Sequence, residues 1–317
     1  MPIINKSKIV WFFVFIFILF VFLIYYLFNN RQKANAVKNA YNKRANQEIS
    51  INNTPADYPI KISVNEFDTD AHAAYVVDIN SMTPLFQKNI DNQLPLASIT
   101  KLMTALVSIE HYSELQVLAV RVEDQVDGNK IGLITGERLL VSELLKALLV
   151  GSANEAAEVL ANNFPEGKAG FVWAMNRKAE ELGLSNTHFA NPVGYDDLEN
   201  YSSARDIAVL SIYAMKNSKI AGLVATGESM IVDVDGINQH QIVATNQLLK
   251  KDGTVLGVKT GWTEEAGECL TAYINRNNHP ILTVILGSSD RFGETEKLAS
   301  WIYENFQWKV IAPPYRL

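Results

Sequence analysis

A serine and a lysine stand three residues apart in the run LPLASITKLMTALV, at Ser98 and Lys101. After Ser98 the apolar residues recur at helical spacing, which predicts a helix with a strongly buried side. Residues three apart on a helix share a face, so Lys101 can reach the Ser98 hydroxyl. A serine hydroxyl is a poor nucleophile until a base takes its proton, and a neutral lysine can act as that base. The ordinary alternative is an N-cap at Ser98 with Lys101 in solvent.

Two further short motifs follow along the chain, Ser152-Ala153-Asn154 and Lys259-Thr260-Gly261. The first falls in the break between two helical runs, and the second falls at the end of a predicted strand. Each motif is a weak signal alone, because a three-residue string can occur by chance. The three motifs together are a strong signal, since they occur in this order, at gaps of roughly 50 and 105 residues, each in a fitting local structure.

With these motifs the chain resembles the serine penicillin-recognising enzymes, and within them the low-molecular-mass penicillin-binding proteins that act as D-alanyl-D-alanine carboxypeptidases. The resemblance covers about residues 74–306 and includes the runs AYVVDINSMTPLFQKNIDNQLPLASITKLMTALV, FANPVGYDDLENYSSARDIAVL, GVKTGWTEEAGECLTAYI and LTVILGSSDRF. Two features depart from it. Many members carry glycine at the position of Ala153, and many continue into a β-rich domain and a C-terminal amphipathic helix, whereas this chain ends at Leu317.

The resemblance implies a substrate, an intermediate and an inhibitor. The substrate is the stem peptide of bacterial peptidoglycan, and Ser98 carries the acyl-enzyme. β-Lactam antibiotics are expected to acylate the same serine. No cofactor is implied.

Lys101 needs a lowered pKa to act as a base. With an ordinary pKa near 10.4, about one lysine in 2,500 is neutral at pH 7. Burial and a second cation nearby could lower the pKa to roughly 7.5 and raise the neutral fraction about 600-fold. Lys259 is the candidate for that cation. It can also attract the terminal carboxylate of the substrate, to which the Thr260 hydroxyl can donate a hydrogen bond.

The resemblance assigns roles to the remaining motif residues. Ser152 would bridge Lys101 and Lys259, and it would pass the proton to the nitrogen of the leaving D-alanine. Asn154 would hold a peptide amide of the substrate.

An oxyanion hole is also implied, at the backbone N–H groups of Ser98 and Trp262. Gly261 would leave room for a substrate backbone to lie beside the strand as an added β-strand. No residue is assigned to activating the water that hydrolyses the acyl-enzyme. Glu155 and Glu158 are near in sequence, but both are expected on a solvated face of their helix.

The pattern along the chain indicates an α+β fold, because strand patterns stand at both ends of the domain and helical patterns between them. The resemblance makes this a DD-peptidase/β-lactamase-like fold, an antiparallel sheet flanked by helices with an inserted helical lobe. The predicted strands cover residues 61–67, 73–79, 229–234, 241–244, 254–259, 269–274 and 281–286. The predicted helices cover residues 96–112, 141–150, 153–163, 171–182, 204–216 and 294–306.

Composition argues against several kinds of site. The net charge is −6 and no basic stripe is present, so no nucleic-acid partner is expected. The single cysteine, Cys269, excludes an intramolecular disulfide and a cysteine-based zinc site. The five histidines are scattered and form no His-x-x-x-His pair, so no metal site is expected.

The clearest single signal is an apolar run at residues 9–28, about 20 residues without a charge, which is long enough to cross a hydrocarbon core of roughly 30 Å. We expect a cytoplasmic tail at 1–8, a transmembrane anchor at 9–28, a polar tether at 29–60 and the catalytic domain at 61–317. The string Ala34-Asn35-Ala36 has the form of a signal-peptidase site. Arg31, Lys33 and the length of the apolar run favour an uncleaved anchor.

Two signals conflict over the side of the membrane. More basic residues follow the apolar run than precede it, which would place the domain inside the cell. The implied substrate lies outside, so we expect a single-pass protein of the bacterial cytoplasmic membrane with an extracytoplasmic domain.

The expected activity is that of a serine-type D-Ala-D-Ala carboxypeptidase. Three alternatives stay open, namely a DD-endopeptidase, a β-lactamase on the same fold and a non-catalytic peptidoglycan-binding module. The presence of Ser98, Lys101 and Lys259 argues against the last of these, because a binding module needs no base beside a nucleophile.

Overall fold

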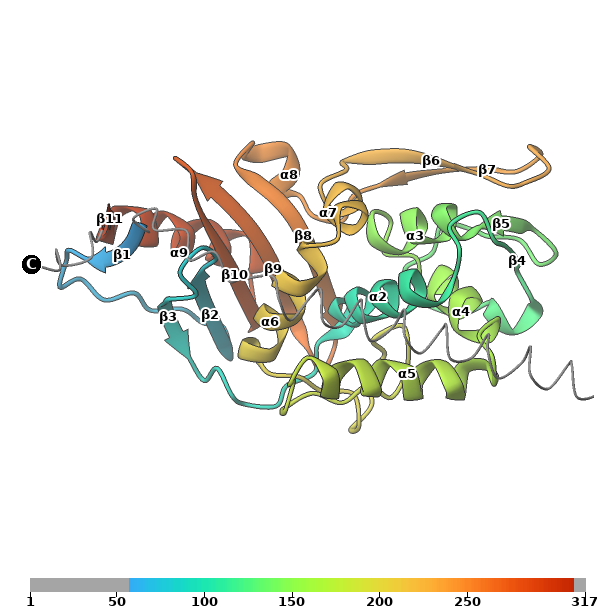
Figure 1. Ribbon diagram of the computed structural model, residues 1–317, viewed down its shortest axis with the longest axis horizontal. Helices are drawn as coiled ribbons and strands as arrows, with labels where there is room; N and C mark the ends of the chain where they lie inside the picture. The colour runs from blue at the N-terminus through green and yellow to red at the C-terminus, as the bar shows by residue number, and fades with distance from the viewer. Residues whose placement is uncertain (1–56, 311–317) are drawn as a thin grey trace, which may run out of the picture. The chain divides into compact units, whose positions relative to one another are not determined.

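A five-stranded antiparallel sheet is the centre of the protein, whose computed structural model describes residues 57–310. The strand order is β3-β2-β10-β9-β8, so two early strands pair with three late ones (Figure 1). The chain leaves the sheet after β3 and returns to it at β8. The bounds are β2 (Ala73–Asp78), β3 (Pro84–Lys88), β8 (Val255–Thr263), β9 (Gly267–Arg276) and β10 (His279–Ser288).

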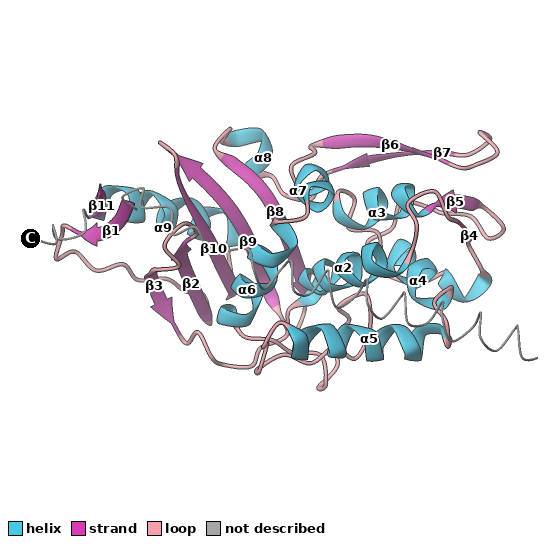
Figure 2. Ribbon diagram, viewed as in Figure 1, coloured by secondary structure: helices cyan, strands magenta, loops and turns pink. Residues whose placement is uncertain are grey.

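The chain between β3 and β8 forms a helical lobe on one side of the sheet (Figure 2). Its helices are the short 3-10 turns η1 (Ala97–Thr100) and η2 (Val122–Asp124), and α2 (Lys101–His111), α3 (Val141–Leu149), α4 (Asn154–Asn162), α5 (Gly167–Glu181), α6 (Ala204–Met215), α7 (Ser218–Val224) and α8 (Leu248–Lys251). Two small antiparallel pairs complete it, β4 (Val117–Ala119) with β5 (Arg138–Leu140), and β6 (Glu228–Val232) with β7 (Gln239–Val243). The predicted α+β class with an inserted helical lobe is confirmed.

The two faces of the sheet pack into separate hydrophobic cores. On β2, Ala73, Tyr75 and Val77 belong to the core shared with the lobe, whereas Ala74 and Val76 belong to the core under α9 (Arg291–Asn305). A strand covered on both faces alternates in this way with a period of two. The covering helices therefore explain why the strand segments of the sheet read as nearly continuous apolar runs.

The predicted strand at residues 61–67 is wrong. The strand at this end is β1 (Asp57–Lys61), which pairs with β11 (Phe306–Val310), and no strand follows it before β2. β1 lies partly inside the range expected for the tether. Almost the whole length of the domain separates the two strands in sequence. A strand that depends on such a distant partner has no pattern in its own residues that would predict it. Six further elements were not predicted, because they are short or because their partners are distant in sequence. They are the strands β3, β4, β5 and β11 and the helices α7 and α8.

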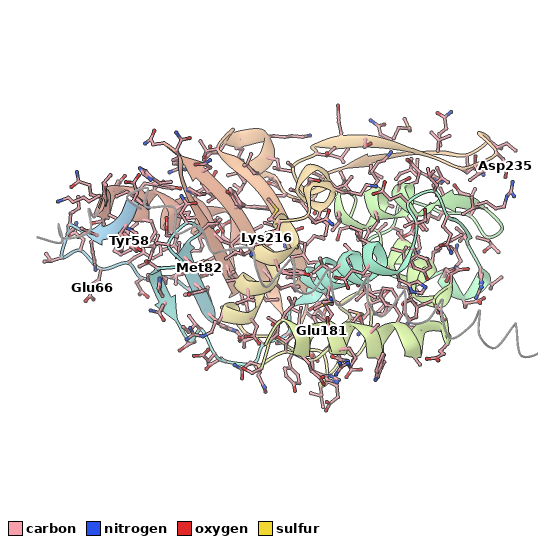
Figure 3. The ribbon with its side chains drawn as sticks, viewed as in Figure 1. Tyr58, Glu66, Met82, Glu181, Lys216 and Asp235 are labelled. Atoms are coloured by element: carbon pink, nitrogen blue, oxygen red, sulfur yellow. The ribbon has the colours of Figure 1, made fainter. Side chains whose placement is uncertain are left out.

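The β6–β7 hairpin contacts the start of β5. Asp235, at the tip of the β6–β7 hairpin, accepts a hydrogen bond from the Arg138 guanidinium at 2.6 Å (Figure 3). On the buried side of the hairpin, His240 Nε2 lies 2.9 Å from Glu137 Oε1. These contacts hold the hairpin against the segment that leads into α3.

The predicted membrane anchor at residues 9–28 lies outside the described residues, and so does most of the predicted tether. Within residues 57–310 no single helix has the length and apolar character needed to cross a membrane. The helices α6 and α7 reach that length only as a pair, bent by 108° where they meet. The predicted domain boundaries stay predictions.

Candidate active site

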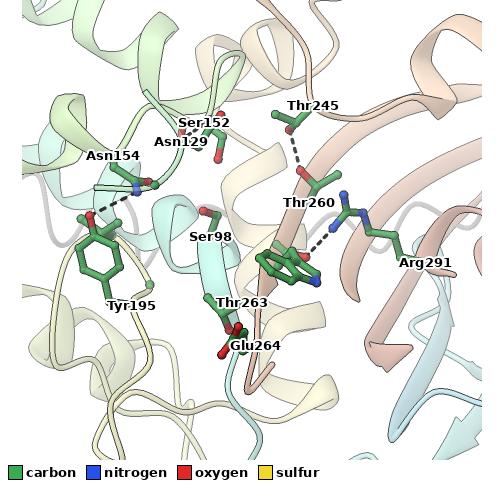
Figure 4. A pocket seen from close by; sticks show the side chains of 15 residues that line it. Ser98, Asn129, Ser152, Asn154, Tyr195, Thr245, Thr260, Thr263, Glu264 and Arg291 are labelled. Carbon is green, nitrogen blue, oxygen red and sulfur yellow. Dashed lines mark hydrogen bonds between the residues drawn. The ribbon is translucent and has the colours of Figure 1, made fainter. Parts of the chain in front are cut away.

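The three sequence motifs meet at one pocket of about 600 Å³ between the helical lobe and the edge strand β8 (Figure 4). Six predicted site residues line this pocket, namely Ser98, Ser152, Asn154, Thr260, Gly261 and Trp262. The two predicted lysines, Lys101 and Lys259, are buried, and each lies within hydrogen-bond distance of one lining serine. All eight residues are thus brought together, although their motifs are far apart in sequence.

Lys101 lies beside the Ser98 hydroxyl, as the spacing predicts. Ser98 is in the 3-10 turn η1 and Lys101 begins α2, so the two side chains meet at the junction. Lys101 Nζ is 2.6 Å from Ser98 Oγ and donates a hydrogen bond to the carbonyl oxygen of Val193 at 2.8 Å. The Lys101 side chain is fully buried, and Ser98 caps neither η1 nor α2. The alternative of an N-cap with a solvent lysine is therefore wrong.

Burial and charge lower the pKa of Lys101 well below its usual value. Removal from water is the larger cause, and the neighbouring Lys259 is the second, whereas Glu155 and Glu158 act in the opposite direction. A neutral amine has a lone pair that can accept the Ser98 proton. The position and the electrostatics of Lys101 therefore both suit a general base.

The loop before Tyr195 packs closely on this part of α2. Thr104 Oγ1 donates a hydrogen bond to the carbonyl oxygen of Pro192 at 2.6 Å, one turn along the helix from Lys101. Gly194 has a φ of +94°, and a Cβ on it would lie 1.9 Å from the carbonyl oxygen of Ala97. Only glycine lets the backbone approach η1 this closely. This contact fixes the position of the Val193 carbonyl, which accepts the hydrogen bond from Lys101.

Lys259 holds the second serine. Its Nζ donates to Ser152 Oγ at 2.7 Å and to the carbonyl oxygen of Thr260 at 3.1 Å. Burial, together with the charge of Arg291, lowers the pKa of Lys259 to about 7. Ser152 has a left-handed backbone with a φ of 56°, which places its side chain in the break before α4. Between these described residues, Ser152 has a hydrogen bond to Lys259 and none to Lys101, so one side of the expected bridge is formed.

Asn154 forms the wall of the pocket on the lobe side. Its Nδ2 donates to the carbonyl oxygen of Asp127 at 2.7 Å, and it lies 3.4 Å from the Tyr195 hydroxyl, which donates to the same carbonyl at 2.7 Å. No donor among the described residues reaches Asn154 Oδ1. That oxygen is free to accept a hydrogen bond from a peptide N–H in the pocket.

The opposite wall is the end of β8. Thr260 Oγ1 lies 2.6 Å from Thr245 Oγ1, and Arg291 Nη1 donates to the carbonyl oxygen of Gly261 at 2.8 Å. A Cβ on Gly261 would lie 2.8 Å from the carbonyl oxygen of Leu96, so this position also needs glycine for β8 to lie against η1. Trp262 follows on the pocket rim with 60% of its surface exposed.

The expectation of a solvated face for Glu155 and Glu158 is wrong. Both are 1% exposed. Glu158 Oε1 accepts a hydrogen bond from Lys168 Nζ at 2.7 Å, and Glu155 Oε1 accepts from backbone N–H groups of the segment 131–133. These partners bind one oxygen of each carboxylate, although the helical pattern alone would place both side chains in water. Neither residue lines the pocket.

Sequence reasoning missed several residues that line the pocket, among them Asn129, Tyr195, Thr245 and Arg291. Tyr195 and Arg291 lie in runs that resemble the family, NPVGYDD and SSDRF, and this was the available signal. Asn129 and Thr245 carry no motif. Their roles come from the tertiary structure, because each contacts a motif residue distant in sequence.

Comparisons with known proteins identify the family of the chain. The family of D-alanyl-D-alanine carboxypeptidases, peptidase family S11, matches residues 60–290. The chain belongs to this family. The resemblance seen in the sequence is confirmed, and with it, at the level of the family, the predicted enzyme class of serine D-Ala-D-Ala carboxypeptidases.

Individual relatives carry two kinds of name. The chain is 32% identical over 255 residues to the D-alanyl-D-alanine carboxypeptidase DacF of Bacillus subtilis, covering 77% of this chain and 64% of DacF. It therefore spans just under two thirds of that relative. It is also 32% identical over 237 residues to a D-alanyl-D-alanine endopeptidase of Pseudomonas aeruginosa, covering 73% of this chain and 76% of that protein.

Among solved structures, the Streptomyces K15 DD-transpeptidase is similar, with a TM-score of 0.72 and 27% sequence identity. The match covers 76% of this chain and 100% of that one. The two proteins share their fold over this part of the chain, which confirms the predicted fold.

Proposed function

We propose that the protein removes the terminal D-alanine from peptidoglycan stem peptides through an acyl-enzyme on Ser98. One observation carries this proposal. Lys101, fully buried and close to a second buried lysine, has its Nζ 2.6 Å from Ser98 Oγ. The family and its carboxypeptidase relatives support the substrate class.

In the acylation step, the neutral amine of Lys101 takes the Ser98 proton as Oγ attacks the carbonyl carbon of the penultimate D-alanine. The carbonyl electron pair moves onto oxygen, and the backbone N–H groups of Ser98 and Trp262 stabilise this oxyanion. When the intermediate collapses, the C–N bond breaks and Ser152 donates a proton to the departing nitrogen. Lys259, hydrogen-bonded to Ser152, can replace that proton. Water then hydrolyses the ester: its hydroxyl bonds to the acyl carbon, the bond from that carbon to Ser98 Oγ breaks, and Oγ takes the proton of the water. The proton that Lys101 accepted passes to Lys259, which restores both lysines.

Binding of the substrate uses the two walls of the pocket. Lys259 and the hydroxyl of Thr260 bind the terminal carboxylate at the β8 wall, where Thr245 and Arg291 hold the strand end. Asn154 Oδ1 accepts from a peptide N–H of the substrate on the lobe wall. A peptide extended between these walls presents its penultimate carbonyl to Ser98.

Labelling with penicillin tests the assignment of the nucleophile. Intact-mass spectrometry of the full chain is expected to show one stable penicilloyl adduct, and peptide mapping is expected to place it on Ser98. Ser98→Ala is expected to abolish the adduct. No adduct on the wild type, or an adduct that persists in Ser98→Ala, would refute the proposal. Rapid turnover of the adduct would instead favour a β-lactamase.

A DD-endopeptidase is the second candidate, because the relative from Pseudomonas aeruginosa carries that name. The two activities are separated by their products. Incubation with a monomeric pentapeptide is expected to release free D-alanine, whereas an endopeptidase would convert cross-linked dimers into monomers and leave the pentapeptide intact.

We also propose that residues 9–28 anchor the protein in the cytoplasmic membrane with its catalytic domain outside. The uncharged length of this segment and the extracytoplasmic position of peptidoglycan support the proposal. Protease treatment of intact spheroplasts is expected to digest the domain. Full protection in intact spheroplasts, with digestion after lysis, would place the domain inside.

A further inference from the structure

Glu155, which has no part in the mechanism above, holds a backbone segment through one carboxylate oxygen. Its Oε1 accepts hydrogen bonds from the N–H groups of Ile131 at 2.8 Å, Gly132 at 2.9 Å and Leu133 at 3.4 Å. The segment 131–133 belongs to no helix or strand, and within the described residues these three N–H groups have no other acceptor. The placement of the segment therefore depends on Glu155.

The same stretch of chain forms part of the pocket wall. Gly128 and Asn129 line the pocket, a few residues before the N–H groups that Glu155 binds. Asn129 Nδ2 donates to the carbonyl oxygen of Ser152 at 3.0 Å, and the backbone N–H of Asn154 donates to the carbonyl oxygen of Asn129 at 2.8 Å. Hydrogen bonds therefore join loop 127–133 to the motif at 152–154. Glu155 binds the C-terminal end of this loop.

The burial of Glu155 indicates that its carboxylate has a specific role. Glu155 is 1% exposed, and in the described part of the chain its Oε2 has no hydrogen-bond partner. A buried carboxylate without a neighbouring cation on its oxygens is costly unless several donors converge on it. A residue needed only for packing at this place would be apolar. Three convergent N–H groups are what an anionic oxygen binds well.

We propose that Glu155 is a positioning residue for the active site. Its carboxylate fixes loop 127–133 against the motif at 152–154 and so sets the lobe wall of the pocket that the substrate peptide contacts. The consequence for catalysis rests on the proposed carboxypeptidase activity, whereas the fixing of the loop does not.

Glu155 also bears a charge near Lys101. The effect of this charge on the pKa of Lys101 must be separated from the effect of the hydrogen bonds between Glu155 and the loop. Around Lys101 stand Lys259, Glu155 and Glu158, and both carboxylates raise the pKa of Lys101. Glu155→Asp keeps the charge but shortens the side chain, so it cannot reach all three N–H groups. Glu158→Gln removes a buried charge from the same helix without touching the loop, because Glu158 binds Lys168. These two variants form a matched pair.

Hydrogen–deuterium exchange of the full chain, together with steady-state kinetics, tests the proposal. In the wild type the amides of 131–133 are expected to be protected although they lie in a loop. Glu155→Asp is expected to speed their exchange at least about ten-fold, with exchange elsewhere unchanged. It is also expected to raise KM for a D-alanyl-D-alanine peptide by about ten-fold. Glu158→Gln is expected to leave both quantities near the wild-type values and to shift the acid limb of penicillin acylation to lower pH.

Fast exchange of amides 131–133 in the wild type would overturn the proposal without any variant. So would Glu155→Asp with wild-type exchange and KM, or Glu158→Gln loosening the loop to the same extent. If Glu155→Asp does not fold, the wild-type exchange decides. If the wild type shows protected amides but neither cleaves the peptide nor binds penicillin, the proposed function fails and the loop contact stands.

Discussion

At the scale of residues, the site consists of two buried lysines, each joined to a serine. Lys101 lies beside Ser98 and Lys259 beside Ser152, and the charge of Lys259 helps to lower the pKa of Lys101. The helical spacing of Ser98 and Lys101 could be predicted from the sequence, and so could a second cation at Lys259. The left-handed backbone of Ser152 could not, because serine adopts that conformation only where tertiary contacts impose it.

The pH dependence of acylation follows from this pair. In the proposed mechanism Lys101 acts as a neutral base, so the rate is expected to fall at low pH as Lys101 gains its proton. Lys259→Met removes the nearby cation, which raises the pKa of Lys101 and is expected to move the acid limb to higher pH. The rate of penicillin acylation between pH 5 and about 9 measures this shift.

Thr245→Val is the control, because it removes the hydrogen bond to Thr260 without changing the charge near Lys101. It is expected to slow the reaction with an unchanged midpoint. An acid limb that stays in place in Lys259→Met would contradict the coupling of the two lysines.

At the scale of elements, the site depends on backbones that approach each other closely. η1, the loop before Tyr195 and the end of β8 touch through Gly194 and Gly261, where a side chain would collide with the backbone of η1 or of the residue before it. The sequence predicted the longer helices and most strands of the sheet, because their apolar periods are local. It did not predict the contacts between loops, nor the buried partners of Glu155, because these depend on residues that the fold brings together.

Gly194→Ala tests the approach of the loop to η1. The new Cβ would lie 1.9 Å from the carbonyl oxygen of Ala97, so the loop must move and take the carbonyl of Val193 away from Lys101. We expect penicillin acylation to fall at least about 100-fold and the free energy of unfolding to fall by about 1–3 kcal/mol.

Gly136→Ala is a matched control, since Gly136 has a φ of +93° but nothing within 4 Å of the Cβ position. It carries the same backbone strain without the collision. Equal losses of acylation in the two variants would mean that the collision with Ala97 is not the cause.

At the scale of the whole domain, the first and the last strand of the described chain pair with each other. Both strands are distant in sequence from the three motifs of the site. β1 pairs with β11, and Trp308 of β11 stacks on His279 and donates from Nε1 to Asp78 Oδ2 at 2.9 Å. None of these residues lines the pocket. Stability and catalysis should therefore be separable at this end of the domain.

Trp308→Ala is expected to lower the free energy of unfolding by about 1–3 kcal/mol, which corresponds to a fall in Tm of about 2–12 °C for a domain of this size. At temperatures well below Tm, kcat/KM is expected to stay within about two-fold of the wild-type value. Thermal melts and peptide hydrolysis on the same preparation measure both. A loss of kcat/KM at low temperature would show that the β1–β11 pair reaches the site.

The burial of the two lysines has a consequence for folding. The pKa of Lys259 in the folded protein, about 7, lies below the ordinary value of 10.5 that it regains on unfolding. Unfolding between these two pH values therefore takes up a proton, so this group lowers stability fully below about pH 7 and progressively less as the pH rises towards 10.5. Lys101 acts in the same direction. The same fold with apolar residues at 101 and 259 is expected to be more stable at neutral pH, which means that folding stability alone would not retain either lysine.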